Sequence, residues 1–274
     1  MFLTLRTLKM KNQGIVKMLI FTVLALWVAA CNPSVKDEKI PVTTESESAR
    51  LLYDRADALF EKVYIPQAVD LLEGALAEDP NFFMAAYDLA THHMYFEDKK
   101  AFKKYAERAV QSEIKLSRGE DLLKEALQKL LEDQKADVTE TGRELVKLYP
   151  NDSEAYFPLS FFQQIIGDHQ GQAETLWKAA EIKEDPANVF NMLGYTYMAM
   201  GQFDDAAEAL DKYRALKPEE PNPYDSKGDY YMAIEEYGKA YESFMKAVEI
   251  DSTWTGSLRK ANKARAMIKT NNKE

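Results

Sequence analysis

The chain has 274 residues, of which 46% are hydrophobic and 29% are charged. This composition excludes collagen-like, low-complexity and wholly disordered proteins, and the low content of 11 Gly and 10 Pro favours helices over a sheet protein with many tight turns. The formal net charge is −10, and residues 1–30 hold four Lys or Arg and no acid, which leaves −14 for the remainder. So acidic a surface repels phosphate backbones, and nucleic-acid binding is therefore excluded.

The first predicted element is a leader peptide. Basic residues precede the stretch 18–30, in which only Thr22 is polar, and the only cysteine, Cys31, follows it. This is the pattern of a secretory signal peptide, and the apolar stretch is shorter than the roughly 20 residues that span a membrane. A single cysteine can form neither an internal disulfide nor a thiolate zinc cluster.

Val28, Ala29, Ala30 and Cys31 resemble the lipobox of bacterial lipoproteins. The resemblance implies that residues 1–30 are removed and that Cys31 carries a diacylglycerol and a further acyl chain such as palmitate. Asn32 replaces the Asp that favours the inner membrane in similar lipoproteins, which implies the outer membrane. A plain secreted protein with a cysteine beside its cleavage site is the alternative.

Residues 31–48 are predicted to be the lipidated cysteine and a flexible tether, because they hold two prolines, several hydroxyls and few large apolar groups. Residues 36–38 resemble a short export tag of surface lipoproteins, although a solvated charge run fits them equally well. The expected location is therefore the bacterial cell envelope, lipid-anchored in the outer membrane, on its periplasmic face or at the cell surface.

The body repeats with a period of about 34 residues, in blocks 49–82, 83–118, 119–152, 153–186, 187–220 and 221–254. Each block holds two helical patterns. Position 8 of the blocks is always small, which predicts that the two helices of a block approach closely there. The residues at this position are Ala56, Ala90, Ala126, Ser160, Gly194 and Gly228.

The block 187–220 places Leu193, Gly194, Tyr197, Ala206 and Pro218 where the tetratricopeptide-repeat family has its characteristic residues. The chain resembles that family over residues 49–254. The resemblance implies an all-α fold, a right-handed α-solenoid of about six tetratricopeptide helix pairs.

Block 119–152 is the weakest copy, with Glu125, Lys129 and Gly142 at nominal core positions. Its leucine stripe predicts either a first helix rotated by about one residue or a leucine patch in the groove. The stripe consists of Leu122, Leu123, Ala126, Leu127, Leu130 and Leu131.

Residues 255–274 are predicted to be a capping helix and tail, because an array of stacked repeats leaves an apolar face open at its end. Leu258, Ala261, Ala264 or the stem of Arg265, and Ile268 are expected to cover the sixth block, while the cations of this helix stay in water. Those cations serve either solubility or a nearby membrane surface.

By resemblance to peptide-binding members of the family, the first helix of each block lines a concave groove. Aromatic and Met side chains suit partner anchoring, and acids at both ends, Glu61 among them, predict a partner segment that is apolar with some Lys or Arg. Packing of many of these side chains between neighbouring helices is the alternative. The groove residues are Tyr53, Asp57, Phe60, Tyr87, Thr91, Met94, Tyr95, Phe157, Phe161, Gln164, Asn191, Tyr195, Met198, Asp225, Asp229 and Met232.

The sequence gives no indication of catalysis. His92 and His93 are adjacent, so they cannot grip one metal from the same helix, and His169 falls in an expected turn. No phosphate loop or nucleophile elbow is present, so we expect no catalytic residue, cofactor or metal. The predicted function is a non-catalytic adaptor or scaffold lipoprotein that binds another envelope protein; the alternative is a glycan-binding surface lipoprotein, although the groove holds no Trp.

Overall fold

The computed structural model describes residues 39–271, and Lys39–Glu274 form one compact unit with its own core. The predicted leader, Cys31 and the tether as far as residue 38 lie outside the described residues. Residues 39–271 contain no strand. None of the helices found in them is long and apolar enough to cross a membrane.

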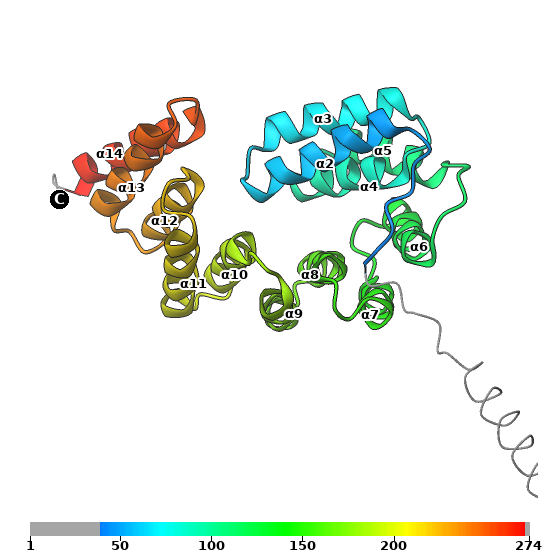
Figure 1. The fold of residues 1–274 in the computed structure, drawn as a ribbon. Helices are drawn as coiled ribbons and strands as arrows, with labels where there is room; N and C mark the ends of the chain where they lie inside the picture. The colour runs from blue at the N-terminus through cyan, green and yellow to red at the C-terminus, as the bar shows by residue number, and fades with distance from the viewer. Residues whose placement is uncertain (1–38, 272–274) are drawn as a thin grey trace, which may run out of the picture. The chain divides into compact units, whose positions relative to one another are not determined.

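The helices follow one another in pairs, one pair for each predicted block, and a last helix ends the array (Figure 1). Each helix packs against its neighbours in the chain. This all-α solenoid with a capping helix confirms the predicted fold class. The elements are α2 (Glu47–Glu61), α3 (Ile65–Glu78), α4 (Phe83–Tyr95), α5 (Lys99–Val110), α6 (Arg118–Glu132), α7 (Thr139–Leu148), η1 (Ser153–Ala155), α8 (Tyr156–Ile165), α9 (His169–Ile182), α10 (Ala187–Ala199), α11 (Phe203–Leu216), α12 (Asn222–Ala233), α13 (Tyr237–Ile250) and α14 (Thr255–Asn271).

The two helices of a pair are joined by a turn with the same backbone geometry in five of the six blocks. One residue of each turn has a left-handed φ: 61° at Val63, 58° at Glu97, 77° at Gly167, 71° at Gly201 and 62° at Glu235. All five occupy position 15 of their block, so the repeat period fixes a backbone conformation as well as a packing pattern.

The small residues at position 8 lie where the paired helices cross. A Cβ added to Gly194 would lie 2.5 Å from Leu210 Cδ2, and one added to Gly228 would lie 2.4 Å from Phe244 Cε1. Both contacts are far below ordinary van der Waals separation, so the helices come this close only because the residue is glycine. The predicted close approach is confirmed.

The third pair, α6 and α7, departs from the others as its sequence does. Leu122, Leu123, Leu127 and Leu130 are buried, whereas Glu125 and Lys129 at the nominal core positions are exposed. Helix α6 is therefore rotated about its axis relative to the other first helices. The alternative of a leucine patch open to the groove is wrong.

The last part of the predicted tether does not hang free. Residues 39–46 form an extended strap whose Ile40 and Val42 side chains pack against the core. The strap is also held by hydrogen bonds: Ile40 N–H donates to Asp152 Oδ2, and Thr43 donates from its N–H and its hydroxyl to the two carboxylate oxygens of Glu120. The polar composition of this segment indicated disorder, since composition does not show contacts with distant residues. Here the hydrogen bonds to the fully buried Glu120 order the strap.

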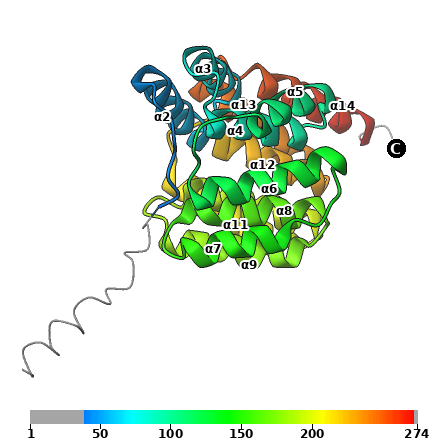
Figure 2. The same ribbon diagram turned by 90° about the vertical axis from the view of Figure 1, so that its right-hand side faces the viewer.

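The capping helix α14 packs on α13 and ends the array (Figure 2). Its buried face consists of Ser257, Ala261 and Ala264. Leu258, which we expected to cover the sixth pair, is 42% exposed, because Ser257 takes the buried position one residue earlier.

Candidate functional site

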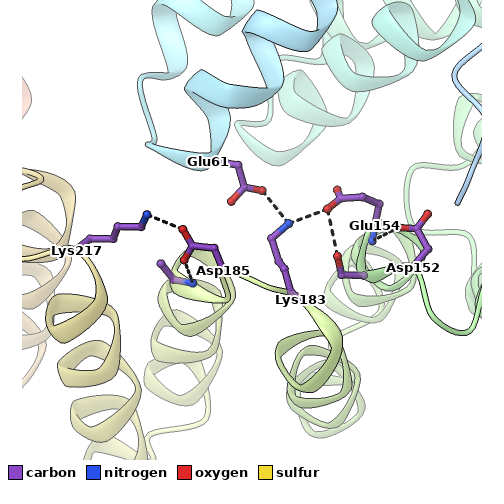
Figure 3. A network of polar contacts seen from close by, with 8 residues as sticks. Glu61, Asp152, Glu154, Lys183, Asp185 and Lys217 are labelled. Carbon is purple, nitrogen blue, oxygen red and sulfur yellow. Dashed lines mark hydrogen bonds and ion pairs between the residues drawn. The ribbon is translucent and has the colours of Figure 1, made fainter.

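The inner side of the solenoid holds a polar cluster centred on a lysine. Figure 1 shows the first helices α8 and α10 on the inner side of the arc and the second helices α7 and α9 on its outer side. Lys183 Nζ lies 3.1 Å from Glu61 Oε1 and 2.8 Å from Glu154 Oε1 (Figure 3). The lysine therefore joins the first helix of the array to the start of the fourth pair.

Local structure aims Lys183 inward. It is the C-cap of α9 and has an extended backbone, and its side chain is only 14% exposed. The ammonium also lies 5.3 Å from the centre of the Phe157 ring, a cation–π contact. Desolvation by itself lowers the pKa of Lys183, but Glu154 and Glu61 outweigh it, and the pKa is raised. The lysine is therefore firmly charged.

Carboxylates outnumber this cation. Asp57 and Asp88 belong to the same electrostatic neighbourhood as Glu61 and Glu154. Burial, with Asp57 and Glu154 adding to it, raises the pKa of Asp88 to about 7, although a hydrogen bond from Tyr53 opposes the shift. Desolvation also raises the pKa of Glu61, although Lys183 lowers it. Desolvation raises the pKa of Asp57 as well, although this side chain keeps contact with solvent. The Lys183 cluster, as we call these four acids and the lysine, is thus short of positive charge.

A row of aromatic rings continues from the cluster toward the end of α4. The Phe60 and His92 ring centres are 6.4 Å apart, His92 and Phe96 are 4.9 Å apart, and Phe96 and Tyr95 are 5.0 Å apart. Tyr95 is 53% exposed and Phe96 61%. Of these, Phe60 and Tyr95 were predicted groove residues, whereas Phe96 was not recognised because it is the C-cap of α4 and lies beyond the first-helix positions that line the groove in the family.

The predicted groove residues near the C-terminus bind α14 instead of facing open solvent. Lys260 Nζ lies 2.7 Å from Asp225 Oδ2 and 2.6 Å from Asp229 Oδ2. Ser257 also donates to Asp225, and the Tyr195 hydroxyl donates to Asp229 at 2.8 Å. Both acids are therefore engaged within the chain, and the larger excess of negative charge on the inner side lies around Lys183.

The other predicted groove residues differ in how deeply they are buried. Tyr87 is 5% exposed in the core beside Phe83, and Asn191 is 7% exposed with an Oδ1 that meets no hydrogen-bond partner among the described residues. Two side chains that were expected to face the hollow are therefore covered. The half-buried remainder is Tyr53, Thr91, Met94, Phe157, Phe161, Gln164, Met198 and Met232.

The first and last pairs also meet. The Tyr64 hydroxyl, in the turn after α2, donates to Asp251 Oδ2 at 2.9 Å, and the Tyr64 ring stands edge-on to Trp254 with centres 5.8 Å apart. This contact, which we call the end latch, joins residues 187 positions apart in the chain. Periodicity cannot predict it, because it depends on how far the array curves.

Other features of the described residues are structural. A cleft of about 450 Å³ is lined by Pro80, Lys104 and Arg108, but the Arg108 guanidinium donates to the carbonyl oxygens of Leu76 and Pro80 and so ties α5 to the preceding pair. The described part of the chain contains no group of three His, Cys, Asp or Glu side chains placed to hold a metal ion.

Comparison with known proteins assigns two of the helix pairs, α10 with α11 and α12 with α13, to a known family. Residues 187–220 and 222–253 match the family model described as tetratricopeptide repeat. No curated protein matches the chain.

Among solved structures, the chain is similar to TTC0263, a thermophilic TPR protein of Thermus thermophilus, with a TM-score of 0.50, 17% identity, and coverage of 80% of this chain and 99% of that one. Two MamA structures give TM-scores of 0.40 at 21% identity, covering 77% and 73% of this chain and 95% and 96% of theirs. At these identities the likeness concerns the fold alone. Residues 187–253 therefore hold two tetratricopeptide repeats, and the described part of the chain is folded as an α-solenoid.

Proposed function

We propose that this protein is a non-catalytic adaptor of the bacterial cell envelope that binds a segment of a partner protein on the inner side of its solenoid. Tetratricopeptide repeats generally mediate protein–protein interaction, and stacked repeats offer an extended concave surface for it. The observation that carries the proposal is the Lys183 cluster, where Glu61 and Glu154 pair with one lysine and Asp57 and Asp88 lie in the same electrostatic neighbourhood.

The cluster and the aromatic row specify the partner. A Lys or Arg side chain of the partner would supply the missing positive charge, and charge-assisted hydrogen bonds to carboxylates are strong in a partly desolvated site. The exposed rings of Tyr95 and Phe96 would receive apolar side chains next to that cation. The partner segment is therefore apolar with some Lys or Arg.

The experiment is co-purification from native envelopes. The variant Asp57→Asn with Glu61→Gln removes two charges from the cluster, and the control variant Glu181→Gln with Glu242→Gln removes two charges from exposed acids on α9 and α13. We expect one partner protein to be lost with the first variant and retained with the second. Equal retention by both variants would show that the Lys183 cluster is not the binding surface.

The tether is the second part of the proposal. The leader pattern and the lipobox resemblance of residues 28–31 support lipidation of Cys31 and attachment to the outer membrane. Cys31→Ser is expected to move the protein from the membrane to the soluble fraction on cell fractionation. Continued membrane association of this variant would refute the lipid tether.

The glycan-binding alternative finds no tryptophan platform in the described residues. Trp177 donates to the Tyr197 hydroxyl at 2.7 Å and packs edge-on against Phe190, and Trp254 belongs to the end latch. Both rings are engaged within the chain, so the protein-binding function is the one we put forward.

A further inference from the structure

The capping helix α14 has a charge opposite to that of the rest of the chain. Its 17 residues include Arg259, Lys260, Lys263, Arg265 and Lys269 and no acid. Since the whole chain carries −10, the remainder without this helix stands at −15. The exclusive use of cations at this end of the array therefore sets the helix apart from the acidic body.

Four of the five cations are free and lie on the outward face. All four are exposed: Arg259 and Lys263 lie opposite the buried Ser257, Ala261 and Ala264, and Arg265 and Lys269 lie on the flank between, and these four make up what we call the outward face. None of the four forms an ion pair with another described residue, whereas Lys260 is bound by Asp225 and Asp229.

The outward face is convex and has no built anion site. The cations form two rows, 259 with 263 and 265 with 269, because residues four apart lie on one side of a helix. Leu258, 42% exposed, also lies outside the buried face. A helix surface with spread charges and no pocket suits a broad anionic plane better than a single carboxylate or phosphate.

We propose that the outward face of α14 binds the anionic phospholipid headgroups of a membrane. The acidic body does not prevent this, because a helix is about 10 Å thick and the Debye length at physiological ionic strength is about 8 Å. Once the helix lies on the headgroups, most of the acidic surface is beyond the range at which it is repelled. The face would act as an electrostatic membrane contact in addition to the acyl chains of the lipid anchor, and in this respect the inference rests on the proposed tether.

The strength follows from the number of cations. Each Lys or Arg close to an anionic membrane strengthens binding about five-fold, so four of them give an effect of several hundred-fold. Such binding is weak for the untethered protein and falls as salt is added.

The test uses residues Lys39–Glu274, the compact unit without Cys31, in co-sedimentation with vesicles of equal parts phosphatidylglycerol and phosphatidylcholine. The α14 variant carries Arg259→Gln, Lys263→Gln, Arg265→Gln and Lys269→Gln. The control variant carries Lys99→Gln, Lys100→Gln, Lys129→Gln and Lys135→Gln, which removes the same charge from exposed lysines of α5, α6 and the turn after α6. Circular dichroism verifies that both variants are folded.

We expect the wild type and the control variant to sediment with these vesicles at low salt, and the α14 variant to lose at least a hundred-fold in partitioning. Vesicles of phosphatidylcholine alone should bind none of the three. Equal loss in both variants, or no binding by the wild type, would overturn the proposal. A wild type that forms dimers without vesicles and loses them in the α14 variant would assign the face to a second copy instead. Because the chain tested lacks Cys31, none of these results depends on the Cys31→Ser experiment.

Discussion

The substitution Gly228→Ala tests the close crossing of α12 and α13. Its new Cβ would lie 2.4 Å from Phe244 Cε1, 2.5 Å from Cδ1 and 2.9 Å from Cγ. The Phe244 ring is fully buried, so it cannot swing away, and the two helices must separate instead. Gly238→Ala is the matched control, because a Cβ added to Gly238 on α13 meets no atom within 4 Å.

The two variants should change stability in opposite directions. Both gain up to about 1 kcal/mol of helix propensity when Gly becomes Ala. Overpacking at Gly228 costs about 1–3 kcal/mol, so after the propensity gain this variant loses up to about 2 kcal/mol in the free energy of unfolding, while Gly238→Ala gains up to about 1 kcal/mol.

The measurement is urea unfolding of residues Lys39–Glu274 followed by far-ultraviolet circular dichroism, with wild type and both variants side by side. The wild type should unfold between the two variants. If Gly228→Ala unfolded at the same urea concentration as Gly238→Ala, the ring of Phe244 would not lie against position 8, and the crossing described for the sixth pair would be incorrect.

Three further predictions concern the turns, the cluster and the latch. Val63→Gly should stabilise the protein by about 0.5–1 kcal/mol in urea unfolding, because a β-branched residue is strained at a φ of 61°. Gly201→Ala should destabilise it by about 1 kcal/mol. If Gly201→Ala were the more stable of the two variants, the shared turn geometry would be refuted. The pKa of Asp88 is raised from 3.8 to about 7, so the folded state binds the extra proton, and the free energy of unfolding falls as pH rises between these values. Asp88→Asn should remove that fall and stabilise the protein by about 1 kcal/mol or more at pH 8. An unchanged pH profile of unfolding in this variant would contradict the prediction. Trp254→Ala should open the end latch, at a cost of about 1 kcal/mol, and increase the radius of gyration in small-angle X-ray scattering; an unchanged radius would show that the latch does not hold the ends together.

The repeat pattern contained most of the fold. The column of small residues ending in Gly194 and Gly228 predicted where helices cross, because this packing depends on residues a fixed distance apart in one block. Even the rotated α6 could be inferred as one of two alternatives from its leucine stripe.

The candidate site was less predictable, because it depends on contacts between blocks. Lys183 and Glu61 are 122 positions apart and meet only because of the curvature of the array, which no local pattern encodes. Asp225 and Asp229 were recognised as acids of α12, the first helix of the last pair, but their pairing with Lys260 depends on the position of α14. The strap and the end latch were missed for the same reason.

Site-specific photo-crosslinking in living cells tests the proposed binding surface most directly. A photoreactive phenylalanine analogue placed at Tyr95, 53% exposed beside the aromatic row, is compared with one at Leu216, 46% exposed at the end of the second helix α11. We predict that Tyr95 yields a crosslink to one partner protein, that Leu216 does not, and that Asp57→Asn with Glu61→Gln weakens the Tyr95 product. Crosslinks to the same protein at equal yield from both positions, or a Tyr95 product unaffected by the loss of the two acids, would contradict binding at the inner side of the solenoid.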